Sequence, residues 1–431
     1  MDFLKNLFNT GKYKTNSEAV IISCYFNPQN SPYRLKAFNI FYDSIKHLNH
    51  RIIECVIGDA KPQLPENENI KRVYTQNLLW HKEALLNLIV ADLPKKFNYV
   101  FWIDADVIFT NNNWLVEACK ELELHSIVQP FEYCIHLERD EVKPSFDLMP
   151  HKLSCMSPKY TNRRVWRSFC ANFHDENLET DVQKDNYNIH GHVGFAWGAR
   201  REVLDKVPLY DKALIGGADH IIAHAAAGQI PHSCITKSFT DDLDNVMAWS
   251  RRFYAVVGES ISYVEGDLYH IWHGDIDKRQ YLKRIQDFTP KTKHLRKDPT
   301  GLYVTHEGDD EYMKKYFRTR EVSPDDGFLT SMAIGYMTDS TVLGMMGGGN
   351  LMGAMVGDML NNSDQVDQPQ NFGDGQMGGA GSTVTWTDDP NTQQQNQPQQ
   401  DIQQDMSGAV VAEDISIPDV PNSEVNSDTF S

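Results

Sequence analysis

The sequence lacks the paired cysteines that mark a disulfide framework or a zinc finger. Its seven cysteines are odd in number, are scattered between positions 24 and 234, and never stand in a CxxC pair. Such cysteines are typical of reduced thiols in a reducing compartment. They argue against a disulfide-rich secreted domain and favour a cytoplasmic protein.

A long hydrophobic run is also missing. No stretch of about 20 apolar residues, the length needed to span a bilayer, occurs in the chain. Residues 1–17 contain no apolar core of secretory length, and we interpret them as a frayed N-terminal extension. A short amphipathic surface helix over residues 1–8 is the alternative. We expect no transmembrane segment and a protein of the bacterial or the virus-infected host cytosol that is not secreted.

Positive charge is absent from the last quarter of the chain. All 41 Lys and Arg residues lie at or before Arg320, whereas 17 of the 59 Asp and Glu residues lie in 321–431. The part up to Arg320 is therefore almost neutral, with 42 acidic and 41 basic residues. Because duplex nucleic acid requires a basic surface, we expect no nucleic-acid partner.

The acidic tail has two parts of different composition. Residues 321–363 are rich in Gly and Met, and glycine interrupts them too often for a stable helix. We interpret this part as an interaction segment that contacts protein partners; folding back on the body, self-association and membrane contact are alternatives. Residues 364–431 are mainly Gln, Asn, Asp, Ser, Gly and Pro, a composition typical of disorder.

Before residue 320, apolar strands alternate with amphipathic helices. Strands are predicted at 19–27, 51–58 and 70–73, and a helix with apolar residues at a spacing of three to four is predicted at 34–48. Further helices are predicted at 78–93 and at 111–122, the second capped by Asn112 or Asn113. This alternation is typical of βαβ units. We therefore predict an α/β fold over residues 18–320, with a mostly parallel, Rossmann-like sheet flanked by helices.

The most informative stretch is residues 99–110, YVFWIDADVIFT. Its first five residues predict a buried strand, and Asp104 and Asp106 follow directly. Ligands of open α/β sheets bind at the carboxyl ends of strands. Carboxylates bind Mg²⁺ or Mn²⁺, which keep positions open for phosphate oxygens. We predict that one of the two carboxylates binds such an ion directly, while the other acts through water or holds a ribose hydroxyl.

In these residues the chain resembles nucleotide-sugar glycosyltransferases of the GT-A fold, whose Asp-x-Asp motif follows a buried strand in the same way. The resemblance covers about residues 18–293. It includes the pattern W-x-K-E-x-x-x-N at 80–87, which is similar to a segment ahead of this motif in bacterial and viral glycosyltransferase-like proteins. It implies a metal-dependent hexosyltransferase that moves a sugar from a nucleotide diphosphate sugar, first of all a UDP-sugar, to a hydroxyl acceptor such as a carbohydrate.

The resemblance also implies residues that bind the donor. Tyr25 and Asn27 match positions near the nucleotide, and ordinary loop packing is their alternative role. Lys82 would reach the nucleotide phosphates as a point charge. The alternative is that Trp80 packs in the interior while Lys82 and Glu83 are solvated.

Residues 190–228 form a second block, in which a strand interrupted by glycines precedes GGAD at 216–219 and an apolar helix. Glycine within a strand indicates close backbone approach. The block is similar to the acceptor region of GT-A galactosyl- and N-acetylgalactosaminyltransferases. This similarity implies Trp197 at the donor and Asp219 as the catalytic base, although helix capping also explains Asp219. The family often has Glu-Asp after the glycines, whereas this chain has Ala218-Asp219.

A third block, YHIWHG at 269–274, places His270 and His273 three residues apart. GT-A enzymes often take their last metal ligand from a C-terminal histidine, which implies His273 first and His270 second; a packed structural pair is the alternative. The basic residues that follow would face the diphosphate or be solvated helix charges; they are Lys278, Arg279 and Arg284.

Residues 131–188 are polar without a sustained period, and we interpret them as a variable insertion on the acceptor side. A competing hypothesis for the whole chain is a non-catalytic protein that binds nucleotide sugars or glycans on a GT-A scaffold. A metal-dependent phosphoesterase is disfavoured because a two-metal site needs more ligands than these blocks contain.

Overall fold

The computed structural model describes residues 12–155, 157, 164–175, 190–236, 239, 242–275, 277–279, 284, 295–304 and 309–321. All of them belong to one unit, Met1–Thr385. Residues 1–11, most of the tail and parts of the predicted insertion lie outside the described residues, so the predictions made for them stay predictions.

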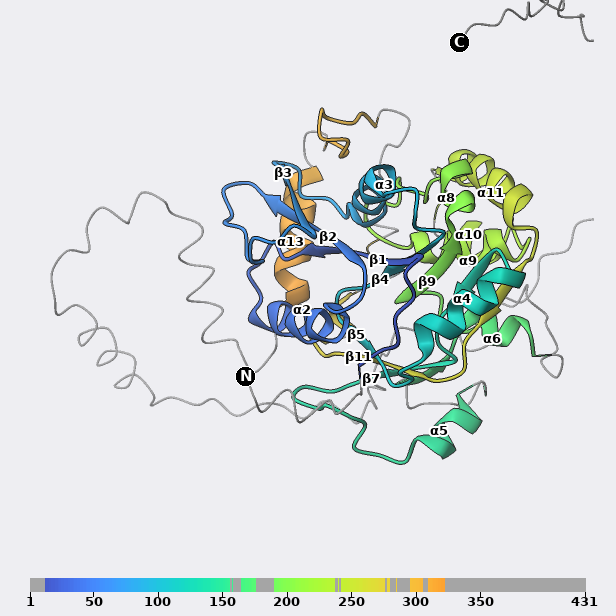
Figure 1. Cartoon of the computed structure of the whole chain (residues 1–431). Coiled ribbons are helices and arrows are strands. Elements are labelled where there is room, and N and C mark those ends of the chain that lie inside the picture. The colour runs from blue at the N-terminus through green and yellow to red at the C-terminus, as the bar shows by residue number, and fades with distance from the viewer. Residues whose placement is uncertain are drawn as a thin grey trace, which may run out of the picture. The chain divides into compact units, whose positions relative to one another are not determined.

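A seven-stranded sheet forms the centre of this unit (Figure 1). Its order is β10 (Ile261–Tyr263), β6 (Ile127–Gln129), β9 (Ala196–Arg200), β4 (Tyr99–Ile103), β1 (Ala19–Phe26), β2 (His50–Ile57) and β3 (Ile70–Thr75). Only β9 runs antiparallel to its neighbours within this sheet. The predicted α/β fold, with a mostly parallel sheet flanked by helices, is confirmed.

The central strands are buried on both faces, so consecutive residues enter different cores. In β1, Val20 and Ile22 pack with helices α3 (Lys82–Asp92), α8 (Arg201–Lys206), α9 (Ala218–Ala226) and α11 (Leu243–Val257). Ala19 and Ile21 pack on the other face with α2 (Pro32–Ile45) and α4 (Trp114–Leu124). Helices on both faces therefore fix the ends of the strands, where the loops lie (Figure 1).

A second sheet of four strands lies below the first (Figure 1), in the order β5 (Val107–Phe109), β11 (Asp267–His270), β7 (Tyr133–His136) and β8 (Val165–Arg167). Strand β11 is parallel to β7 and antiparallel to β5. Two of these strands, with α5 (Leu148–Ser154) and α6 (Phe169–Phe173), come from the region interpreted as an insertion. That region therefore contributes to the core, and its elements are too short to give a period in the sequence.

Some helix boundaries differ from the prediction. The helix expected at 78–93 begins only at Lys82, because Leu78 and Leu79 turn into a separate core with α13 (Asp309–Glu321). Asn113 occupies the N-cap position of α4 but makes no capping hydrogen bond with its side chain.

The remaining short elements are α10 (Ser233–Thr236) and η2 (Asp277–Arg279). None of the helices in the described ranges is long and apolar enough to cross a membrane.

The close backbone approach predicted for the glycine-rich strand is found at Gly198 in β9. Gly198 pairs with Phe101 of β4, and a Cβ atom at Gly198 would lie 2.3 Å from Cε1 of the Phe101 ring. Phe101 therefore packs over the bare glycine backbone.

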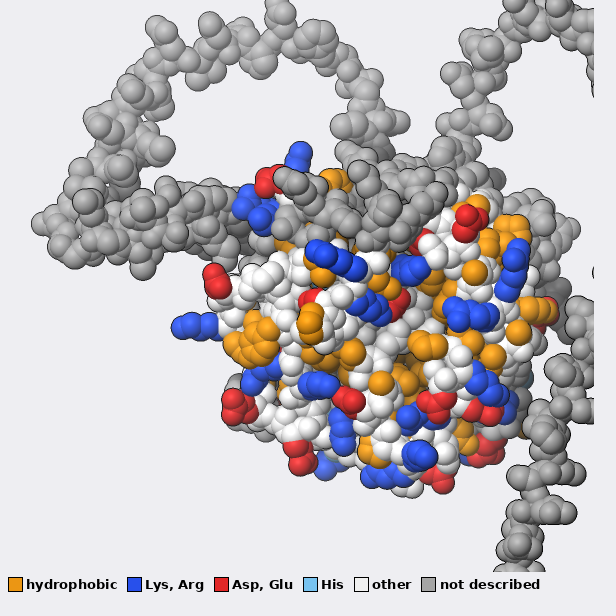
Figure 2. Space-filling model, turned by 90° about the horizontal axis from the view of Figure 1, so that it is seen from above, with side chains coloured by type: hydrophobic (Ala, Val, Ile, Leu, Met, Phe, Trp, Pro, Cys, Tyr) orange, Lys and Arg blue, Asp and Glu red, His pale blue; other side chains and the backbone are white. Residues whose placement is uncertain are grey.

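On the surface shown in Figure 2, basic and acidic side chains are interspersed.

Candidate active site

The Asp-x-Asp loop lies where the strand order of the large sheet reverses. From β1 the chain builds β2 and β3 on one side and then returns to place β4 on the other side of β1. Ligand sites of open α/β sheets form at the carboxyl ends of the strands at such a switch point. The loop is held by two backbone hydrogen bonds, from Asp104 N–H to Phe195 O (2.7 Å) and from Ile271 N–H to Asp106 O (2.8 Å).

The structure brings Asp106, His270 and His273 together, although they are far apart in the sequence. One ligand atom of each lies within 4.8 Å of the others. Asp106 Oδ2 is 2.9 Å from Nε2 of His273 and 3.9 Å from Nε2 of His270. The other oxygen, Oδ1, is buried and makes no hydrogen bond with the described residues. Because an unpaired buried carboxylate oxygen is costly, this cluster fits a bound cation.

Both histidines are suited to metal ligation. Burial and the nearby Arg279 guanidinium lower the pKa of His273 well below its usual value, and burial likewise lowers that of His270 despite Asp106. Both rings are therefore neutral, as ligands must be. Arg279 Nη2 lies 2.9 Å from His273 Nε2 and 3.3 Å from His270 Nε2. The guanidinium thus occupies the ring lone pairs, and a cation bound here would have to displace it.

Lys82 joins Asp104, the first carboxylate of the motif, to Asp219. Its Nζ lies 2.7 Å from Asp104 Oδ1 and 3.2 Å from Asp219 Oδ2. Burial opposes the charged form of Lys82, but Asp104, Asp219 and Glu83 together raise its pKa well above the ordinary value. Asp219 is in the first turn of α9, behind Gly217, which has the left-handed φ of 98°. Asp219 does not occupy the N-cap position of α9, since Gly217 is the cap residue.

Glu83 is a buried carboxyl next to this network. Its side chain is 3% exposed, and burial raises its pKa to about 8, with Asp219 and Asp104 adding to the effect and Lys82 opposing it. Burial also raises the pKa of Asp104 to about 6, against the pull of Lys82. The interpretation of Glu83 as a solvated charge is wrong. In the sequence, Glu83 is marked only by its position next to Lys82. Its burial results from the packing of α3 with distant parts of the chain, which a local pattern does not contain.

The other predicted donor residues are held by packing. The amide of Asn27 donates to Tyr25 Oη (3.1 Å) and to the backbone oxygen of Ser31 (3.0 Å), while its oxygen accepts from Ser31 N–H. Tyr25 packs against Phe38. The structure places Trp197 in the core, where it is 1% exposed and donates to Val193 O. A donor contact by Trp197 would therefore require the core to open.

The basic residues Arg279 and Arg284 after the third block are not solvated helix charges. Arg279 is 6% exposed and Arg284 is 4% exposed. Arg284 donates to the hydroxyl of Tyr316 in α13 and lies over the ring of Trp80. Arg320 also lies over Trp80, 4.7 Å from the ring centroid. Trp80 is thus partly buried against the core that contains α13, and α13 brings the positive charge of Arg320 near His273, a contribution that no local motif indicates.

No protein-family model and no curated protein matches the sequence. Among solved structures, the catalytic domain of Drosophila β1,4-galactosyltransferase 7 in complex with xylobiose is similar with 10% identity and a TM-score of 0.29, covering 68% of this chain and 98% of that one. Mycobacterium tuberculosis glucosyl-3-phosphoglycerate synthase with Mn²⁺ and UDP-glucose has 12% identity and a TM-score of 0.28, covering 66% and 83%. The 4-diphosphocytidyl-2C-methyl-D-erythritol synthase of Anaerococcus prevotii has 10% identity and a TM-score of 0.25, covering 71% and 97%. These weak similarities select no activity.

Proposed function

We propose that the protein is a metal-dependent glycosyltransferase that uses a nucleotide diphosphate sugar, first of all a UDP-sugar, and a hydroxyl acceptor. The observation that carries the proposal is the convergence of Asp106, His270 and His273 at the end of β4, where Asp106 Oδ1 makes no hydrogen bond within the described part of the chain. Mn²⁺ or Mg²⁺ held there would neutralise the charge that develops on the leaving diphosphate.

In this proposal Lys82 changes its partners when the donor binds. It pairs with both Asp104 and Asp219 in the structure, so its charge is shared between the donor side and the acceptor side. A bound diphosphate carries more negative charge than one carboxylate and would attract Lys82. Asp219 would then be released to accept the proton of the acceptor hydroxyl, and Asp104 would hold a ribose hydroxyl.

The proposal is tested by calorimetry of UDP binding in the presence of Mn²⁺. Replacement of Asp106 by Ala should abolish metal-dependent binding and leave the fold intact, because the side chain lies at a strand end. The matched control is Asp43→Ala, which removes an exposed carboxylate that pairs with Lys46. Equal affinity of the wild type and Asp106→Ala would contradict the proposal.

A second measurement separates the enzyme from a binding protein on the same scaffold. Nucleotide sugars are screened by thermal shift with Mn²⁺, and those that bind are tested for donor hydrolysis. Hydrolysis that depends on both Mn²⁺ and Asp106 supports the transferase. Binding without hydrolysis or transfer to any acceptor would favour the non-catalytic alternative.

A further inference from the structure

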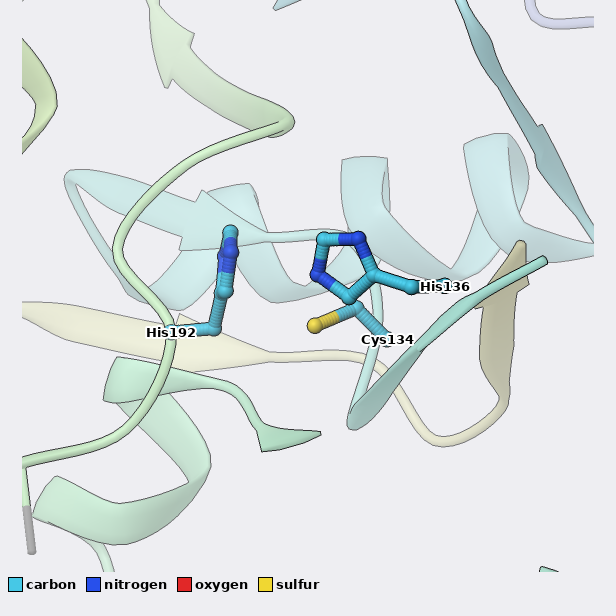
Figure 3. Close-up of side chains that lie close together, drawn as sticks. All are labelled: Cys134, His136 and His192. Carbon is cyan, nitrogen blue, oxygen red and sulfur yellow. The ribbon is translucent and has the colours of Figure 1, made fainter. Parts of the chain in front are cut away.

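A second group of metal-binding side chains lies beside the site just described. Cys134, His136 and His192 each have one ligand atom within 4.8 Å of those of the other two. In Figure 3 the His136 ring turns one nitrogen toward the Cys134 sulfur and the His192 ring. Cys134 and His136 are two residues apart in β7 and so share a face of the strand. His192 comes from the segment before β9, bridged to Ser168.

We propose that Cys134, His136 and His192 form a binding site for a zinc-class cation. One thiolate and two imidazoles are the donors that Zn²⁺ prefers, whereas Mg²⁺ and Mn²⁺ prefer oxygen. Ligands of a tetrahedral zinc ion lie roughly 3.3 to 3.6 Å apart, given metal bonds of about 2.0 Å to nitrogen and 2.3 Å to sulfur. The three donors therefore need to approach by only about 1 Å, which small side-chain rotations provide.

Packing alone does not account for these residue types. His136 is 8% exposed. In Figure 3 its Nε2 faces Cys134 and His192, whereas its Nδ1, which is buried without a hydrogen bond to any described residue, points away from them. A buried imidazole nitrogen without a partner is costly, and an apolar side chain would fill this position more favourably. The Cys134 thiol is fully buried and would lose its proton to the metal.

His192 has one competing contact. Gly194 N–H donates to His192 Nδ1 at 3.2 Å, so His192 coordinates either through Nε2 or by giving up this long bond. Gly194 lies beside Asp219: a Cβ atom at Gly194 would be 3.6 Å from Asp219 Oδ2. A metal at this site would therefore tie β7 to the segment that passes Asp219 and leads to Phe195, the residue that holds Asp104.

The zinc-class site is distinct from the proposed Mn²⁺ or Mg²⁺ site, although the two are neighbours. The His136 ring lies beside the His270 ring, with centroids 4.9 Å apart, because the two residues pair across β7 and β11. The two clusters share no ligand. Of these two clusters, the one around Cys134 contains sulfur, and this difference gives a spectroscopic signal that belongs to one site alone.

The test is cobalt substitution of the full chain, with zinc content measured by mass spectrometry. Co²⁺ bound to a thiolate produces a charge-transfer absorption in the near ultraviolet. We expect this absorption in the wild type, in Asp106→Asn, and in Cys155→Ala, which removes a neighbouring buried thiol as a matched control. We expect Cys134→Ala and His192→Gln to lower the affinity for Co²⁺ at this site by roughly tenfold or more.

Circular dichroism and gel filtration show whether each variant is folded. If Cys134→Ala unfolds, His192→Gln serves as the test variant, because His192 is only half-buried. Absence of the thiolate band in the wild type, or its persistence at full intensity in folded Cys134→Ala, would overturn the proposal. Loss of the band in Asp106→Asn would overturn the separation of the two sites. Retention of the band in Asp106→Asn, with loss of Mn²⁺-dependent UDP binding, separates this inference from the proposed function.

Discussion

At the scale of single residues, each of the three carboxylates of the site contacts a nitrogen group. Asp104 and Asp219 both contact Lys82, and Asp106 contacts His273, which in turn contacts the Arg279 guanidinium. In the proposed function, each carboxylate would exchange this nitrogen group for a ligand when substrate binds. Of the three carboxylates, Asp219 alone lies on a helix of the acceptor-side block, which makes it the residue whose role can be tested separately.

We expect Asp219→Asn to reduce sugar transfer by roughly 10²–10⁴-fold, because the amide cannot accept a proton. Asn keeps the shape of Asp and can still accept a hydrogen bond from Lys82, so donor affinity and stability should remain near those of the wild type. Transfer kinetics and UDP-sugar calorimetry measure the two effects. Normal transfer would show that Asp219 only orders Lys82, and loss of donor binding would place it on the donor side.

Glu83 should make stability depend on pH. Its pKa is about 8 in the folded chain but near 4.5 when exposed, so between these values the folded state holds a proton that the unfolded state releases. Stability should therefore fall as the pH rises from about 5 to 8. Glu83→Gln should flatten this dependence and raise the melting temperature at pH 8 by several degrees. The exposed Glu68→Gln is the control; parallel curves for the wild type and Glu83→Gln would refute the buried proton.

Local sequence patterns identify candidate site residues that lie in or directly after a strand. Asp104, Asp106, His270 and His273 each stand out beside a strand, and the structure brings Asp106 together with both histidines. The sequence does not identify Glu83 or the arginines as buried, because their burial depends on α13 and on helices far away in the chain. Cys134, His136 and His192 escape sequence reasoning for the same reason: β7 is four residues long, and its partner ligand comes more than fifty residues later.

At the scale of elements, the prediction succeeds where a strand is mostly apolar. β1, β2 and β4 are recognisable because burial on both faces favours apolar residues at most of their positions. The second sheet is not recognisable, since its strands have three or four residues and owe their structure to pairing with each other. The predicted start of α3 is wrong because Leu78 and Leu79 satisfy a helical pattern but pack against α13 instead.

The pairing of β4 with β9 gives a prediction at this scale. Gly198→Ala places a methyl group 2.3 Å from a ring carbon of Phe101, and two central strands leave neither residue free to move away. We expect a loss of about 1–3 kcal/mol in the free energy of unfolding, measured in urea. In a Phe101→Leu background the same change should cost less. An equal cost in both backgrounds would show that the ring is not the obstacle.

At the scale of the whole molecule, the chain separates into a nearly neutral part and an acidic one. The boundary in charge falls at Arg320, and α13 ends at Glu321. Helix α13 belongs to the folded part, since Met313 and Phe317 are at most 1% exposed and Phe317 stacks on Trp80. Residues 325–431 contain no Lys or Arg to compensate their acidic groups, and their composition favours an unfolded chain.

These observations predict opposite results for two truncations. A chain that ends at Pro324 should keep the melting temperature and the Mn²⁺-dependent UDP affinity of the full protein, because it retains all of α13. A chain that ends at Gly308 should be strongly destabilised. It loses the buried side chains of Met313, Tyr316 and Phe317, each worth about 1.5–3 kcal/mol of burial, and it uncovers Trp80. Calorimetric melting distinguishes the two. A large loss of stability in the chain ending at Pro324 would mean that the Gly- and Met-rich segment packs against the folded part, whereas unchanged stability of the chain ending at Gly308 would remove α13 from the core.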